Sequence, residues 1–138
     1  MKEYPWMKIA KEKLGEHEIP GPKTNKFIGE CLQSTGHPPD DSIPWCSAFT
    51  NKIMELAGYQ GTGSAWARSW LDWGREPTDE EFGKGVIVIL SRGPNAGHVG
   101  FLEDWDDENV TLLGGNQNDS VSNATFPQWR VLGWRIPA

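Results

Sequence analysis

The chain has 138 residues, of which 37% are apolar, and its 19 acidic and 13 basic residues give a formal net charge of -6. This length fits one core, and we expect residues 1–138 to form a single domain. The acidic balance, without a run of lysine and arginine, argues against a nucleic-acid partner. No segment approaches the ~20 apolar residues of a membrane span, so no membrane insertion is expected. The first residues, Met1–Trp6, lack the apolar core of a signal peptide, which predicts a cytoplasmic location in the producing cell.

Apolar residues that recur every three or four positions predict four helices in the first half of the chain. Their expected spans are 6–14, about 26–35, about 44–57 and 65–71. The candidate N-caps are Thr24 or Asn25 for the second helix, Asp41 or Ser42 for the third and Ser64 for the fourth.

The third of these helices carries Cys46 in its first turn, just after Pro44. A thiol in that position lies near the positive end of the helix dipole, which favours the thiolate and can lower the pKa of a cysteine from roughly 8.5 toward neutrality. Because the thiolate is the nucleophilic form, Cys46 is a candidate nucleophile. The alternative is a buried, unreactive thiol on a core helix.

From Gly85 onward the pattern changes to that of β-strands. The apolar, β-branched run Val86–Leu90 predicts a strand buried on both faces, and further strands are expected at His98–Glu103, Val110–Gly115 and Val131–Ile136. Helices first and strands afterwards predict an α+β domain, in which the helices pack on one face of a mainly antiparallel sheet of about four to six strands.

His98 opens the second of these strands, where its ring can face a cleft. A simple hairpin between the second and third strands places Asn116 opposite His98. An amide there can hydrogen-bond one ring nitrogen and direct the other toward a nucleophile, as the third member of a catalytic triad does. A slip of one residue would bring Gly115 or Gln117 opposite instead.

The remaining cysteine, histidines and tryptophans suggest fewer roles. Cys31 falls on the apolar side of its helix and is expected to be a core thiol, and His17 and His37 lie in polar loops. No spacing typical of zinc ligands and no phosphate-binding glycine loop is present, so neither a metal nor a cofactor is expected. Eight tryptophans suggest either core packing or an aromatic groove, and three glycines leave room for a helix or a substrate to approach the sheet. These glycines are Gly100, Gly114 and Gly115.

Five segments together resemble a small phage-associated branch of the bacterial cell-wall cysteine peptidases, the CHAP and NlpC-type superfamily. They are Pro44–Phe49, Ala57–Ala65, Ala67–Leu71, Gly97–Phe101 and Leu112–Gln117, and Gly21–Asn25 also fits that branch. The resemblance covers nearly the whole chain.

The resemblance implies a papain-like α+β fold with Cys46 as nucleophile, His98 as its partner and Asn116 as the group that orients His98. Relatives often carry a glutamate and, two residues later, an asparagine in the third strand; Asn116 and Asn118 stand at these positions here, without the glutamate. Asn118 is therefore a candidate substrate-binding residue. Trp45, Trp66 and Trp70 are the candidate walls of the cleft.

The function that the resemblance implies is hydrolysis of an amide bond in or at the murein stem peptide by a monomeric enzyme whose partner is peptidoglycan. The lack of a signal suits a phage or prophage endolysin, which acts on the wall after release. A secreted antibacterial effector with the same chemistry is one alternative. A non-catalytic wall-binding or phage structural module that uses only an aromatic groove is another.

Overall fold

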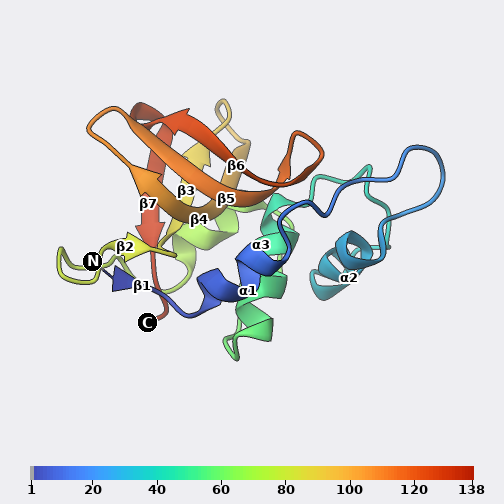
Figure 1. Ribbon diagram of the computed structural model, residues 1–138, viewed down its shortest axis with the longest axis horizontal. Coiled ribbons are helices and arrows are strands. Elements are labelled where there is room, and N and C mark those ends of the chain that lie inside the picture. Colours follow the sequence, from blue (N-terminus) through green and yellow to red (C-terminus); the bar gives the residue numbers. More distant parts are fainter. Residues whose placement is uncertain (1) are drawn as a thin grey trace.

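The computed structural model describes residues 2–138 and has two layers, one of helices and one of strands (Figure 1). The helices are α1 (Trp6–Glu12), α2 (Lys26–Ser34) and α3 (Cys46–Leu56), with the 3-10 helices η1 (Ala67–Asp72) and η2 (Gln128–Arg130). The main strands are β3 (Ile87–Ser91), β4 (Gly97–Trp105), β5 (Asn109–Gln117), β6 (Ser120–Pro127) and β7 (Val131–Arg135). This arrangement confirms the predicted α+β class.

The five main strands form one antiparallel sheet in the order β6-β5-β4-β3-β7. Four of them lie close to their predicted positions, and β6 is an additional edge strand. A second, small sheet pairs β1 (Lys2–Glu3) with β2 (Gly83–Lys84) in parallel. In the β4–β5 hairpin, Phe101 pairs with Leu113 and Leu102 with Leu112, which is the register that a simple hairpin predicts.

The three helices pack as a layer on one face of the sheet. α3 contacts β4 and β5 directly, and α1 and α2 pack against α3 (Figure 1). Alternate strand residues, among them Ile87, Val99 and Phe101, enter the core beneath the helices. Their neighbours, such as Val88 and Leu102, form a second apolar cluster on the opposite face. A strand with apolar residues on both faces is buried from both sides, as predicted for Val86–Leu90, the segment that forms most of β3.

The helix starts differ in how well their caps were predicted. Asn25 caps α2, since its side-chain Oδ1 accepts a hydrogen bond from the Ile28 N–H at 3.0 Å. For α3 the predicted caps are wrong: Trp45 is the N-cap and makes no side-chain cap bond, while Asp41 accepts the Ile19 N–H at 3.2 Å. A turn closed by the hydrogen bond from the Ile43 N–H to the Asp40 carbonyl separates these side chains from the helix start.

The fourth predicted helix is the 3-10 helix η1, which begins two residues later than expected. Ser64 is not its N-cap, because that position is occupied by Trp66. The Ser64 hydroxyl accepts the Trp66 N–H at 3.1 Å and so stabilises the turn that precedes the helix.

A glycine sets how closely α3 approaches the sheet. A Cβ atom on Gly115 of β5 would lie 2.6 Å from the Cβ of Phe49 and 2.7 Å from the ring of Trp45. Separations below 3 Å between such atoms are not tolerated, so only glycine allows this contact. The close approach expected from the glycines of the third predicted strand is therefore present, and it places Cys46 against the sheet.

We expect Gly115→Ala to lower the free energy of unfolding by about 1–3 kcal/mol, because its methyl group would push α3 from β5. Urea denaturation measures this loss. Gly100→Ala is a graded control, since its nearest neighbours would lie 3.2 Å from the added atom. The packing argument fails if the two substitutions cost the same.

Candidate active site

Cys46 is the first residue of α3 and only 4% of its surface is exposed. Burial raises the pKa of its thiol above the ordinary value, while interactions with the backbone N–H groups of Val99 and Ser47 and the charge of Arg92 lower it less. The predicted direction of this pKa shift is thus reversed, because desolvation of the thiolate outweighs the nearby backbone N–H groups and the charge of Arg92. The interaction with Val99 places the sulfur beside the first residues of β4.

His98 lies next to Val99 on β4 and is 3% exposed. Its Nε2 atom is 2.8 Å from Oε1 of Gln117. The amide nitrogen of Gln117 donates to the carbonyls of Leu112 at 3.2 Å and Ser122 at 2.7 Å. Because these two carbonyls fix the orientation of the amide, its oxygen faces His98 and Nε2 carries the proton. In the neutral ring, Nδ1 therefore has a free lone pair.

The surroundings of His98 keep the ring uncharged. Burial lowers its pKa to about 4, the hydrogen bond with Gln117 raises it, and the positive charges of Arg92 and Arg130 lower it further. At neutral pH the Cys46 thiol is therefore protonated and the His98 imidazole is neutral. Within residues 2–138 no hydrogen bond joins these two side chains, which line different cavities.

The structure places Gln117, and not Asn116, against the ring of His98. Pairing between β5 and β6 shifts by one residue between Gly114 and Gln117, and Asn116 within this bulge has a left-handed φ of 59°. The extra residue reverses the alternation of side chains, so Gln117 takes the side of the sheet on which His98 lies. Asn116 is half-buried at the rim. The asparagine at position 116 could have indicated this bulge, because asparagine is enriched among the non-glycine residues that adopt a positive φ.

Arg92 lines two separate cavities. One, of about 410 Å³, is bordered by Cys46, Trp66 and Gly97. The other, of about 420 Å³, is bordered by His98 and Gln117 and includes Asn116, Asn118 and Arg130. The thiol and the imidazole thus each face a hollow wide enough for part of a peptide. Arg92 and Arg130 were not identified from the sequence, because no local pattern brings them together.

Of the three predicted wall tryptophans, only Trp66 borders a cavity. It is 56% exposed, and its indole N–H donates to the Asn95 carbonyl at 3.3 Å. Trp45 and Trp70 are fully buried, so their prediction as cleft walls is wrong. The Trp45 indole donates to Glu18 at 2.9 Å and the Trp70 indole to the Ser47 hydroxyl at 2.8 Å. Both brace the start of α3 instead.

Other groups lie apart from this site. Cys31 is fully buried in the core, and burial raises its pKa to about 12. Within residues 2–138, no three histidine, cysteine, aspartate or glutamate side chains gather as metal ligands do. No helix in the described part of the chain is both long enough and apolar enough to cross a membrane.

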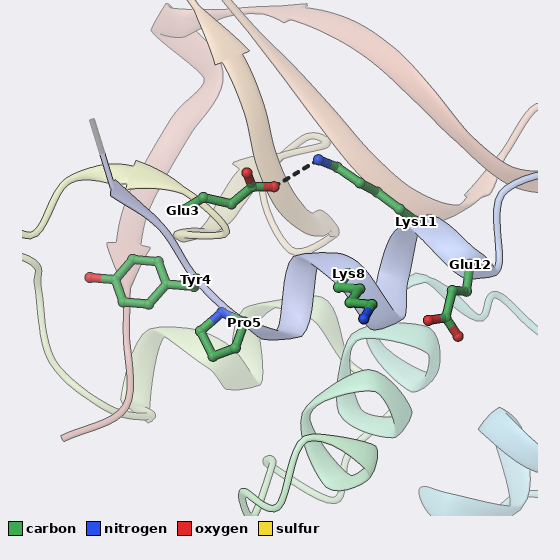
Figure 2. Close-up of a pocket in the computed structure, with 6 residues that line it drawn as sticks. All are labelled: Glu3, Tyr4, Pro5, Lys8, Lys11 and Glu12. Carbon is green, nitrogen blue, oxygen red and sulfur yellow. Dashed lines mark hydrogen bonds and ion pairs between the residues drawn. The ribbon is translucent and has the colours of Figure 1, made fainter.

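A hollow of about 590 Å³ lies between the N-terminal segment and α1 (Figure 2). Lys11 reaches across it to Glu3, with 2.7 Å between Nζ and Oε2, and this contact lowers the pKa of Glu3. Its other labelled residues are Tyr4, Pro5, Lys8 and Glu12 (Figure 2). The hollow is bordered by neither a cysteine nor a histidine.

Comparisons with known proteins find a family model and a solved structure that match this chain. The model of the CHAP domain family matches residues 38–116, which include Cys46 and His98. Among solved structures, a lipoprotein-like protein of the NLP/P60 family from Staphylococcus aureus superposes with a TM-score of 0.54 at 15% sequence identity. The match covers 99% of this chain and 44% of that one, so the present chain spans less than half of its length. A search of curated proteins finds no match.

The neutral His98 predicts a pH-dependent stability. Below pH 6.5 the unfolded chain takes up a proton on this ring, whereas the folded protein does so only near a pKa of about 4. Stability is therefore lost as the pH falls, and this one group should account for about 2 kcal/mol between pH 7 and pH 5. Urea denaturation of the wild type and His98→Asn at both pH values isolates the difference. Parallel losses in the two proteins would contradict it.

Proposed function

The chain belongs to the CHAP domain family, a family of peptidoglycan hydrolases, and we propose that it cleaves an amide bond in or at the murein stem peptide. In this proposal Cys46 is the nucleophile and His98 the general base. The observation that carries it is the amide of Gln117, which fixes the proton of His98 on Nε2 and leaves Nδ1 free to accept another.

The reaction begins from the uncharged pair. As the Cys46 sulfur attacks the amide carbon, Nδ1 of His98 takes the thiol proton, and a C–S bond forms. His98 then protonates the leaving amine as the C–N bond breaks, which gives a thioester. Water attacks the thioester with His98 again as base, and the thiol regains its proton when the acid product leaves.

Because burial disfavours both the free thiolate and the imidazolium, the proposed step transfers the thiol proton as the C–S bond forms and not beforehand. The charge that develops on the substrate oxygen needs donors of its own. The backbone N–H of Cys46 is in the first turn of α3, where such groups lack an intrahelical partner. One donor of this kind can stabilise an oxyanion by a few kcal/mol.

The biological setting is a further part of the proposal. The motif segments resemble a phage-associated branch, which favours a phage or prophage endolysin that acts on the wall after release from the cytoplasm. A secreted effector would use the same residues and chemistry. A non-catalytic wall-binding module would need neither Cys46 nor His98, and the partly exposed Trp66 beside Cys46 is the feature that it would use.

We predict that the wild type releases soluble fragments from purified peptidoglycan and that Cys46→Ala and His98→Ala do not. Mass spectrometry of the fragments identifies the new termini and hence the bond that is cleaved. Cys31→Ala is the matched cysteine control, because its thiol lies in the core and it should retain activity. Full activity of Cys46→Ala would exclude the mechanism. Binding to the wall without release by any variant would favour the binding module.

The orienting role of Gln117 has a separate prediction. We expect Gln117→Ala to lower kcat by about tenfold or more, less than loss of the nucleophile, because His98 would lose its preferred tautomer. Asn116→Gly is the control, since glycine keeps the left-handed backbone and removes only the neighbouring amide. Steady-state kinetics on a defined stem peptide gives both values. If the glycine variant lost more activity than the alanine variant, Asn116 would be the orienting residue.

A further inference from the structure

We propose that the cavity beside His98 holds a free carboxylate of the substrate between Arg92 and Arg130, so that the enzyme prefers stem peptides with an acidic residue near the scissile bond. This inference rests on the proposed function and names the class of substrate that it takes.

The charge of this cavity differs from that of the rest of the chain. Although the protein carries a net charge of -6, no aspartate or glutamate lines the cavity. Four basic residues elsewhere, Lys11, Lys84, Arg75 and Arg135, have carboxylate partners. Within residues 2–138, neither Arg92 nor Arg130 takes part in an ion pair. Their positive charge is therefore available to a ligand.

Arg130 is held so that its guanidinium can serve as a receptor. Its Nε donates to the Ser91 carbonyl at 3.0 Å, and its guanidinium carbon lies 5.2 Å from the centre of the Phe126 ring. The same ring lies 5.3 Å from that of His98. An arginine anchored through Nε retains two terminal nitrogens, whose planar arrangement matches the two oxygens of a carboxylate.

Arg92 is positioned through the turn that carries it. The guanidinium of Arg68 donates to the carbonyls of Gly93 at 2.7 Å and Ala96 at 2.9 Å, and the Arg92 N–H also donates to Ala96. The turn is thus fixed by hydrogen bonds at both ends. Since Arg92 borders the cavity of Cys46 as well as that of His98, its charge lies where the two halves of a bound peptide would meet.

The neutral lining also suits a carboxylate. Three asparagines offer amide donors around the two arginines. These asparagines are Asn116, Asn118 and Asn123. A long polyanion would be repelled by the acidic surface of the chain, whereas one carboxylate on a peptide meets only this local positive field. We therefore favour an acidic residue of the peptide over a phosphate-bearing wall polymer.

The test uses two synthetic stem peptides that are identical except for one side group next to the scissile bond, a free carboxylate in one and a carboxamide in the other. We expect the wild type to have a kcat/KM about tenfold or more higher for the carboxylate, because charge-assisted hydrogen bonds to arginine are lost with the amide. Arg92→Gln and the double variant Arg92→Gln/Arg130→Gln should reduce or abolish this preference. Arg75→Gln, which removes an arginine outside both cavities, should keep it.

Arg92→Gln tests the proposal even if the double variant does not fold, because this exposed side chain has no ion-pair partner to lose. Equal cleavage of both peptides by the wild type, or a preference that survives Arg92→Gln and the double variant, would overturn the inference and leave the proposed hydrolase intact.

Titration calorimetry with Cys46→Ala measures binding without turnover. Tighter binding of the carboxylate peptide than of the carboxamide peptide, reduced by Arg92→Gln, supports the subsite. If the wild type cleaves neither peptide but this binding is seen, the proposed hydrolysis is wrong and the subsite remains. Inorganic phosphate is the second probe. If it binds to this variant more tightly than the carboxylate peptide does, the inference is overturned in favour of a phosphate ligand.

Discussion

One extra residue in β5 determines how the site is built. The left-handed backbone at Asn116 turns the next side chain, that of Gln117, toward His98. The amide can extend there because Gly114 has no Cβ, which would otherwise lie 2.7 Å from the Gln117 oxygen. The carbonyls of Leu112 and Ser122 then fix the amide, and the amide fixes the tautomer of His98. Without the bulge, Asn116 would face His98 with a shorter side chain.

Cys46, the proposed nucleophile, depends on the same strand through a different glycine. Gly115 lets Phe49 and Trp45 of the α3 region rest on β5, and Trp70 supports the helix start through Ser47. This packing buries Cys46, and the desolvation of its thiolate exceeds the stabilisation by nearby N–H groups and by Arg92, so the pKa of the thiol is raised. The result is a thiol that stays protonated, and therefore less prone to oxidation, until its proton has an acceptor.

Local patterns in the sequence predicted the helices, most strands and the cap at Asn25, because periodicity and capping act over a few residues. They also predicted the pairing of Phe101 with Leu113 and of Leu102 with Leu112 in the β4–β5 hairpin, but they did not predict the bulges. The polar edge strand β6 was missed, since its residues alternate without a strong apolar face. Trp45, Trp66 and Trp70 have the same side chain, and only tertiary packing decides which of the three is exposed. The reversed pKa shift of Cys46 likewise follows from burial, which depends on the whole fold.

The charges around the site act in opposite directions on its two reacting groups. Arg92 favours the thiolate of Cys46, whereas Arg92 and Arg130 both disfavour the imidazolium of His98. A free enzyme with this arrangement is poorly suited to accept the thiol proton. An anion bound between the two arginines would offset their charge at His98 and raise its basicity, while the helix terminus and the N–H of Val99 would still favour the thiolate. In the proposed mechanism, binding of an acidic substrate would then itself make His98 a stronger base, so that recognition and activation would use the same pair of side chains.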